Sequence, residues 1–231
     1  MALGIENNYR RIRHEIDKTA RSCHRDPDRI RLIAVSKRKS AELIQQALDG
    51  GARDFGENYI QEAVKKIDLI GKDAACWHFI GHLQSNKTRF AVQYFDYIHT
   101  VDSLKLAREI NKQAAKRDKV QKILIQINIG NEASKSGAVA EQAVELVNAV
   151  SQLDQIAVKG LMCMPPFFPD PENARTYFKQ LSRLKEQVES SGIGNIGLAH
   201  LSMGMSNDFK VAIEEGSTMV RVGTSIFGER D

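Results

Sequence analysis

A lysine stands directly after a short apolar run near the start of the chain. In the segment LIAVSKRKS, which begins at Leu32, four apolar residues lead into Ser36 and Lys37. An amine that is partly desolvated has a lowered pKa, so more of it is in the nucleophilic neutral form. Such an amine condenses with a carbonyl compound to form a Schiff base. The alternative is that Lys37 is an ordinary surface residue of the basic triplet KRK, and this stretch alone favours the surface interpretation.

Two segments near the other end of the chain suit a phosphate group. LAHLSMGMS contains Ser202 and Gly204, and STMVRVGTSIFG contains Gly223 and Thr224. Glycines let backbone N–H groups approach phosphate oxygens closely, and hydroxyl groups complete such a cradle. Because both segments read as strands that end in these residues, they predict an anion-binding site formed by two neighbouring strand ends.

An arginine accompanies the second of these segments. Arg221 precedes Gly223 by two residues, so both lie on the same face of a strand. An arginine inside a protein requires a polar partner, and a core salt bridge to Asp54 or Glu57 would supply one. The other interpretation combines Lys37, the phosphate cradle and the inward arginine into one site for pyridoxal 5'-phosphate, and this combination is the one we favour.

These residues need a fold that brings distant segments together. Runs typical of strands alternate with amphipathic stretches typical of helices, and the expected strands are residues 30–36, 53–57, 76–81, 97–101, 121–129, 156–163, 198–203 and 219–224. Eight repeats with no linker between them predict a single α/β domain over residues 1–231, a closed (β/α)8 TIM barrel. An extra helix is expected over residues 5–22. Barrel active sites lie at the carboxyl ends of the strands, which is where Lys37 would meet the phosphate cradle.

Composition limits the class of protein. Hydrophobic residues make up 42% and charged residues 27%, as in a soluble globular protein, and the net charge of +4 is spread along the chain. We expect no nucleic-acid partner, since the basic stretch HLQSNKTR falls at a helix start where solvated charge is usual. No window approaches the roughly 20 apolar residues of a membrane span. The charged N-terminus and three separated cysteines indicate a cytoplasmic protein. We also expect a monomer, because no apolar helix face stands out as an interface.

Three other patterns have simpler explanations. GIGNIG fits G-x-G-x-x-G, but it follows a helix and precedes a strand, so it predicts a helix end and a turn. Cys76, His78 and His82 have no fourth ligand nearby, so we expect hydrogen bonds there and no metal. Residues Ser134–Gly137 are either another anion cradle or a polar loop, and the sequence does not choose between these.

The order of several motifs is similar to that of a known family. Together they resemble the pyridoxal phosphate homeostasis proteins, and they are AVSKRK, FGENYIQE, WHFIGHLQSNK, HTVDS, INIGNEASKSG, GLMCMPP, LSMGMSNDF and GSTMVRVGTSIFG. This is a single-domain barrel family related to the N-terminal domain of alanine racemase. The resemblance extends from about residue 5 to Arg230, and small departures such as Val222 affect no assigned position.

The resemblance implies a role for each matching residue. Lys37 is similar to the lysine that carries the cofactor as an internal aldimine. Arg221 is similar to the residue that faces the pyridine nitrogen, and Asn58 of the GEN motif lies near the ring in similar proteins. The implied phosphate ligands are Ser202, Gly204, Gly223 and Thr224, and the weaker candidates for contact are Met203 and His78.

Arg221 also limits the chemistry that the resemblance implies. Arginine does not give up its proton, so the ring nitrogen stays unprotonated and the cofactor is a weaker electron sink than an Asp-paired one. Alanine racemases use the same arginine arrangement but take a second base from an extra β-domain, and this sequence stops at Asp231, after the barrel. We therefore expect a carrier that holds and releases pyridoxal phosphate in cofactor homeostasis and supplies apo-enzymes, with no established catalytic residue. The alternative is a slow pyridoxal phosphate-dependent amino-acid racemase.

Overall fold

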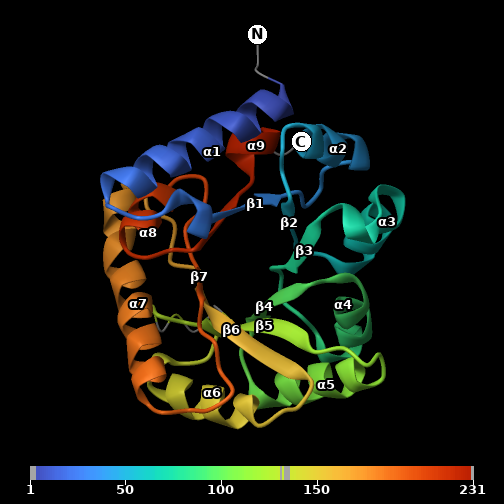
Figure 1. Cartoon of the computed structure of the whole chain (residues 1–231), viewed down its shortest axis with the longest axis vertical. Helices are drawn as coiled ribbons and strands as arrows, with labels where there is room; N and C mark the ends of the chain where they lie inside the picture. Colours follow the sequence, from blue (N-terminus) through green and yellow to red (C-terminus); the bar gives the residue numbers. More distant parts are fainter. Residues whose placement is uncertain (1–3, 131, 133–135, 230–231) are drawn as a thin grey trace.

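Eight parallel strands close into a barrel in the computed structural model of the protein, which describes residues 4–130, 132 and 136–229. The strands follow one another around the barrel in chain order, with β1 pairing to both β2 and β8 (Figure 1). They are β1 (Arg31–Val35), β2 (Asp54–Glu57), β3 (Cys76–Phe79), β4 (Tyr97–Val101), β5 (Gln121–Ile127), β6 (Ile156–Cys163), β7 (His200–Ser202) and β8 (Met219–Val222). The expected fold class and all eight expected strands are confirmed, with ends that differ from the expected ones by at most two residues.

Helices surround the barrel and connect successive strands. They are α1 (Ile5–Ser22), α2 (Ala41–Asp49), α3 (Ile60–Ile70), α4 (Thr88–Tyr94), α5 (Leu104–Ala115), α6 (Ala143–Ser151), α7 (Arg175–Ser190), α8 (Phe209–Glu214) and α9 (Thr224–Phe227). The expected extra helix is α1, which lies outside the ring and contacts α2, α8 and α9 (Figure 1). Its buried face includes Tyr9, Ile12 and Ile16 at helical spacing, so apolar burial accounts for its position.

The protein has two apolar layers, one on each side of the strands. The outer layer lies between strands and helices and contains the largest fully buried side chains, such as Trp77 and Phe55. The inner layer lies within the barrel and contains Ile33, Leu124 and Met219. Successive side chains of a strand point to opposite faces, so every second residue of each strand must face the barrel interior. Several of those inward residues are polar, and they bear on the functional site below.

The last strand ends earlier than its sequence indicates. β8 stops at Val222, and the chain enters α9, where the amides of Ile226 and Phe227 both donate to the carbonyl oxygen of Gly223 at 2.9 Å. Gly223 and Thr224 therefore form the turn between a strand and a helix instead of a strand end. The GIGNIG stretch follows α7 and precedes β7, and Gly192 there has a φ of 72°, so the expected helix end and turn are confirmed.

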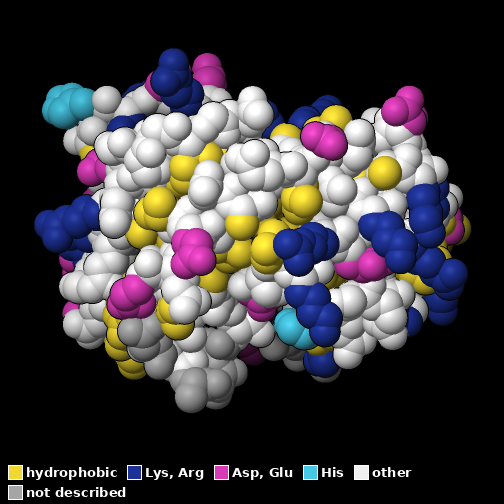
Figure 2. Space-filling model, turned by 90° about the horizontal axis from the view of Figure 1, so that it is seen from below, with side chains coloured by type: hydrophobic (Ala, Val, Ile, Leu, Met, Phe, Trp, Pro, Cys, Tyr) yellow, Lys and Arg dark blue, Asp and Glu magenta, His cyan; other side chains and the backbone are white. Residues whose placement is uncertain are grey.

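The surface carries both signs of charge. Figure 2 shows acidic and basic side chains interspersed on one face, with hydrophobic side chains between them. No helix of the described residues is both long enough and apolar enough to span a bilayer.

Candidate cofactor-binding site

A cavity of about 410 Å³ opens at the carboxyl ends of the strands. Its volume is in the range that holds small ligands. It brings together Lys37 from the β1–α2 loop, Asn58 after β2, and Arg221 on β8. The complete lining is Val35, Lys37, Asn58, Ile80, Met162, Met164, Phe167, Met205, Ser206, Asn207, Asp208, Arg221, Gly223 and Thr224.

Lys37 lies at this cavity because β1 ends just before it. The amide of Ser36 donates to the carbonyl oxygen of Gly56 at 3.0 Å, which extends the β1–β2 ladder by one residue beyond Val35. Ser36 is fully buried, whereas Lys37 is half-buried and lines the cavity wall. The apolar run thus carries the lysine to the mouth of the barrel, as the sequence predicted.

A buried charge cluster holds the backbone next to Lys37. Lys66 of α3 has 6% of its surface exposed, and its Nζ donates to the carbonyl oxygen of Ser36 at 2.7 Å. The same Nζ donates to Glu57 Oε1 at 2.8 Å, and that oxygen also accepts the hydroxyl of Ser36 at 2.7 Å. Burial raises the pKa of Glu57, and the charge and hydrogen bond of Lys66 oppose this rise. Glu62 completes the cluster by accepting from Lys66 Nζ and from the amide of Arg38.

Arg221 reaches the cavity from inside the barrel. It is 4% exposed, and its Nη1 and Nη2 donate to Ser202 Oγ at 2.6 Å and to the carbonyl oxygen of Cys163 at 3.0 Å. Arg221 does not form the salt bridge to Asp54 or Glu57 that the sequence allowed. Asp54 instead accepts from Arg31 at 3.1 Å, and Glu57 pairs with Lys66. Burial lowers the pKa of the Arg221 guanidinium, which remains a strong donor.

Three residues expected at the cofactor are not part of the cavity wall. Ser202 ends β7 with its side chain inside the barrel, where it accepts from Arg221 and contacts His99 at 2.9 Å. Met203 belongs to the outer apolar layer. His78 of β3 is fully buried and hydrogen-bonds His99 and Asp54, nearer the opposite end of the barrel. None of the three is part of the cavity lining, because inward or outward direction alternates along a strand.

Ser206 lines the cavity and was missed from the sequence. Its Oγ accepts the amide of Gly223 at 3.3 Å, so it stands across the cavity edge from the β8–α9 turn. The turn that brings it there depends on Gly204, which has a φ of 92° and whose added Cβ would lie 2.6 Å from Cβ of Ala212. The sequence could have indicated Ser206, because it is a second serine only two residues after Gly204 in LSMGMS. The hydroxyls of Ser206 and Thr224 both line the cavity and are suited to an anion, and the amide of Gly223 holds Ser206 Oγ in place.

Asn58 presents a buried acceptor to the cavity. Its Oδ1 has no hydrogen-bond partner among the described residues. Gly81 packs so closely on it that an added Cβ would lie 2.1 Å from the carbonyl oxygen of Asn58. Buried polar atoms are normally paired, so a bound ligand that donates a hydrogen bond would complete this position. A smaller adjacent cavity of about 260 Å³ shares Asn58, Ile80, Met162 and Met164 with the first one.

The loop after β6 forms an apolar edge of the cavity. Met164 and Phe167 line it from the proline-rich stretch, and Phe167 is 75% exposed. Asn207 ties this loop to the segment after β7 by donating to the carbonyl oxygen of Phe168 at 2.9 Å. Asp208 also lines the cavity, and its Oδ1 accepts the amide of Met205 at 2.6 Å. Burial raises the pKa of Asp208.

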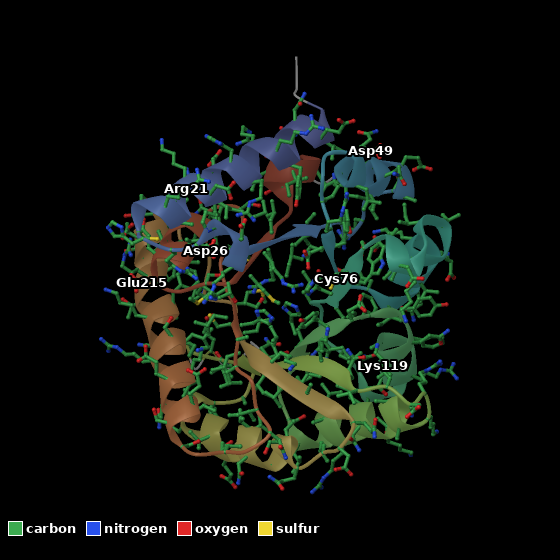
Figure 3. All side chains as sticks on the ribbon, in the orientation of Figure 1. Arg21, Asp26, Asp49, Cys76, Lys119 and Glu215 are labelled. Atoms are coloured by element: carbon green, nitrogen blue, oxygen red, sulfur yellow. The ribbon has the colours of Figure 1, made fainter. Side chains whose placement is uncertain are left out.

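The histidines and the cysteine considered as metal ligands are separated. His82 is exposed near the mouth, where its Nδ1 lies 3.4 Å from Ser136 Oγ. Cys76 and His78 are near the other end of the barrel, where their ligand atoms and a carboxylate oxygen of Asp54 lie within 4.8 Å of one another. Figure 3 shows Cys76 on the inner side of the barrel wall. The Asp54 oxygen there accepts hydrogen bonds from both His78 and Arg31. These donors occupy the carboxylate oxygen that a cation would need as a ligand.

The loop after β5 is described only in part. Ser134 and Lys135 lie outside the described residues, so the choice between an anion cradle and a polar loop stays open. Gln126 donates to the carbonyl oxygen of Ser136 at 2.8 Å, and Gly137 has a φ of 133°. These contacts attach the end of the loop to β5.

The whole chain matches known proteins. It matches the family of the alanine racemase N-terminal domain over residues 7–231. A pyridoxal phosphate homeostasis protein from Escherichia coli strain K12 is 42% identical over 233 residues, which cover 98% of this chain and 97% of that protein. One from Aquifex aeolicus is 40% identical over 220 residues and covers 95% of this chain and 96% of that protein. The chain belongs to the pyridoxal phosphate homeostasis protein family.

Solved structures agree with this family assignment. PipY from Synechococcus elongatus, a structure with pyridoxal phosphate bound, is 34% identical with a TM-score of 0.81 and covers 92% of this chain and 100% of that one. A protein from Bifidobacterium adolescentis is 33% identical with a TM-score of 0.91, over 97% of this chain and 94% of that one. Alanine racemase from Corynebacterium glutamicum is 17% identical with a TM-score of 0.73, over 98% of this chain and 61% of its own, and shares the fold.

Proposed function

We propose that this protein binds pyridoxal 5'-phosphate in the cavity at the carboxyl ends of the strands and holds it covalently on Lys37. When bound, the cofactor supplies an aldehyde that condenses with a primary amine: the Lys37 nitrogen becomes doubly bonded to the aldehyde carbon, and the aldehyde oxygen leaves as water. The observation that carries the proposal is that Lys37, Arg221 and the Gly223–Thr224 turn line one cavity. The bound cofactor in PipY supports the same proposal.

The residues of the cavity fit the parts of this cofactor. The hydroxyls of Ser206 and Thr224 offer hydrogen-bond donors for the phosphate, with the amide of Gly223 holding Ser206 Oγ and Gly204 setting the turn. Arg221 would donate to the pyridine nitrogen, which accepts when unprotonated. Asn58 would meet the ring hydroxyl with its unpaired oxygen. Ser202 and His78 lie in the barrel interior and Met203 in the outer apolar layer, so the proposed direct contacts do not include them.

We propose cofactor storage and release, with delivery to apo-enzymes, as the biological role in the cytoplasm. An unprotonated ring nitrogen opposite Arg221 makes the cofactor a weak electron sink, which disfavours turnover of amino acids. Schiff-base formation is reversible by water, so the same bond that retains the cofactor permits its release. The names of the relatives, which refer to homeostasis, support this role.

The covalent bond is tested by reduction. Purified protein is incubated with pyridoxal phosphate, reduced with borohydride and digested, and the modified peptide is identified by mass spectrometry. We expect the label on Lys37 and none in the variant Lys37→Ala, with Lys39→Ala labelled like the natural protein as the matched control. Labelling of another lysine, or of none, would refute the assignment.

The non-catalytic role is tested by hydrogen exchange. The loaded protein is incubated with single L-amino acids in deuterated water, and deuterium at the α-carbon is followed by NMR together with the ratio of enantiomers. We expect neither exchange nor racemisation at a rate of repeated turnover. Sustained exchange would overturn the carrier role in favour of the racemase alternative.

A further inference from the structure

A row of polar side chains runs through the barrel interior from the cavity to the opposite end. Arg221 Nη1 donates to Ser202 Oγ at 2.6 Å, and Ser202 Oγ lies 2.9 Å from Nδ1 of His99. His99 Nε2 lies 2.9 Å from Nδ1 of His78. His78 Nε2 lies 2.9 Å from Oδ1 of Asp54. The four residues that follow Arg221 in this row come from four other strands, one from each. We call these four residues the interior relay (Asp54, His78, His99, Ser202).

The far end of the interior relay is an ion pair. Arg31 Nη1 donates to the Asp54 oxygen that also contacts His78, at 3.1 Å. Burial acts to raise the pKa of Asp54, but the hydrogen bonds from His78 and Arg31 and the charge of Arg31 outweigh it, so the pKa is lowered. Asp54 is therefore a carboxylate near neutral pH and can only accept hydrogen bonds.

The hydrogen bonds of the interior relay can run in only one direction when both rings are neutral. Because the carboxylate of Asp54 accepts, His78 Nε2 must carry a hydrogen and its Nδ1 must accept from His99. His99 Nε2 is then the donor, and His99 Nδ1 accepts the hydroxyl hydrogen of Ser202. The serine oxygen is left to accept from Arg221, which can only donate. Every group from the arginine to the carboxylate thus has its donor and acceptor matched.

The surroundings of His99 favour the neutral form of its ring. His99 is fully buried, and burial, together with the charge of Arg221, holds its pKa well below its usual value. The ring of Tyr97 stacks on His78 at 5.0 Å between centroids and is itself covered by the cations of Arg31 and Lys122.

We propose that Asp54, His78, His99 and Ser202 are positioning residues for Arg221 toward the cofactor ring. The relay fixes the orientation of the guanidinium, and the negative end at Asp54 polarises each bond in turn, so that Ser202 Oγ becomes a stronger acceptor for Arg221. The strength of the hydrogen bond from Arg221 to the pyridine nitrogen then depends partly on the carboxylate of Asp54 at the other end of the barrel. This inference rests on the proposed function of the cavity.

The direction of the relay is tested in the cofactor-free protein. With ¹⁵N-labelled histidine, NMR separates protonated from unprotonated ring nitrogens, and substitutions of single histidines by glutamine assign the six residues. We expect Nδ1 of both His78 and His99 to be unprotonated and Nε2 of both to be protonated. A protonated Nδ1 on His99 would overturn the proposal, whatever the protein does with pyridoxal phosphate.

The influence on the cofactor is tested with Asp54→Asn, which keeps the shape and removes the charge. We expect pyridoxal phosphate to dissociate about 5-fold more readily and the absorption spectrum of the bound cofactor, and its pH titration, to shift. Asp96→Asn is the matched control, since Asp96 accepts the amide of Trp77 at 2.8 Å outside the relay. Thermal unfolding establishes that both variants are folded.

The outcomes separate the two proposals. If Asp54→Asn binds the cofactor with the spectrum and affinity of the natural protein, or if Asp96→Asn changes both equally, the relay does not act on Arg221. If the natural protein shows no covalent cofactor on Lys37 while the histidine pattern is as expected, the proposed function fails and the relay remains only as a hydrogen-bond pattern of the interior.

Discussion

Nζ of Lys66 lies 2.7 Å from the carbonyl oxygen of Ser36, the residue immediately before Lys37. A lysine on α3 thus restrains the backbone from which the proposed Schiff-base lysine extends. Its ammonium is buried with Glu57 and Glu62 and paired with both, so its desolvation is compensated within the cluster. The sequence places these residues about 30 positions apart, and only the closed barrel brings them together.

Lys66→Met should destabilise the protein by about 3–5 kcal/mol, because it leaves the carboxylate of Glu57 buried without its cation. We also expect weaker retention of pyridoxal phosphate, since the backbone before Lys37 loses its restraint. Denaturant unfolding and cofactor titration measure the two effects. The control is Lys65→Met, at the exposed neighbour in the same helix, which should change stability by less than about 0.5 kcal/mol. Equal effects of both substitutions would contradict the role given to the cluster.

The double variant Ser206→Ala, Thr224→Val should bind pyridoxal phosphate at least about 10-fold more weakly, because two hydrogen bonds to a charged group are lost. Binding of pyridoxal, which has no phosphate, should stay nearly the same. Titration with each compound separates phosphate contacts from ring contacts. Ser225→Ala, at a neighbouring hydroxyl outside the cavity lining, serves as control. Unchanged affinity for pyridoxal phosphate in the double variant would remove the phosphate cradle from this position.

Gly204→Ala should cost about 2–4 kcal/mol of stability, because it combines a positive φ with a steric clash. The φ is 92°, and the added Cβ would lie 2.6 Å from Cβ of Ala212. Gly192→Ala is the matched control: its φ is 72° and nothing lies within 4 Å of its added Cβ, so only the backbone cost of about 1–2 kcal/mol applies. Denaturant unfolding of both variants measures the difference. Equal losses of stability in the two variants would show that the turn after β7 accommodates the added methyl group without a steric cost.

His200 should make the protein less stable as the pH falls from 6.5 towards 4. Burial, followed by the charge of Arg31, lowers the pKa of His200 from 6.5 to about 4. The unfolded chain therefore takes up a proton in this window before the folded one does, so stability present above pH 6.5 is lost on acidification. His200→Gln should reduce the slope of unfolding free energy against pH, and His14→Gln, at an exposed histidine, is the matched control. Identical slopes for the natural protein and His200→Gln would refute the assignment.

The sequence predicted where the cavity lies, but it did not predict every residue that lines it. Lys37, Asn58, Arg221, Gly223 and Thr224 all line the cavity, as expected. Each follows a strand or lies in the last two residues of one. Parallel strands in a barrel present their carboxyl ends on one side. The sequence does not reveal the side-chain direction at strand ends. Ser202 and Ser206 are both serines of LSMGMS, but the turn at Gly204 leaves the first inside the barrel and places the second at the cavity.

The sequence by itself determined the class of fold, the lysine at the mouth of the barrel and the type of chemistry that an amine, an anion cradle and an arginine permit. These follow from local patterns: the alternation of strands and helices, and residue types at strand ends. Only the tertiary structure decided which buried polar groups meet. Asp54 and Ser202 lie 148 positions apart in the chain, yet His78 and His99 join them by hydrogen bonds across the barrel. The physical reason is that barrel closure makes neighbours of side chains whose spacing along the chain contains no information about their contact.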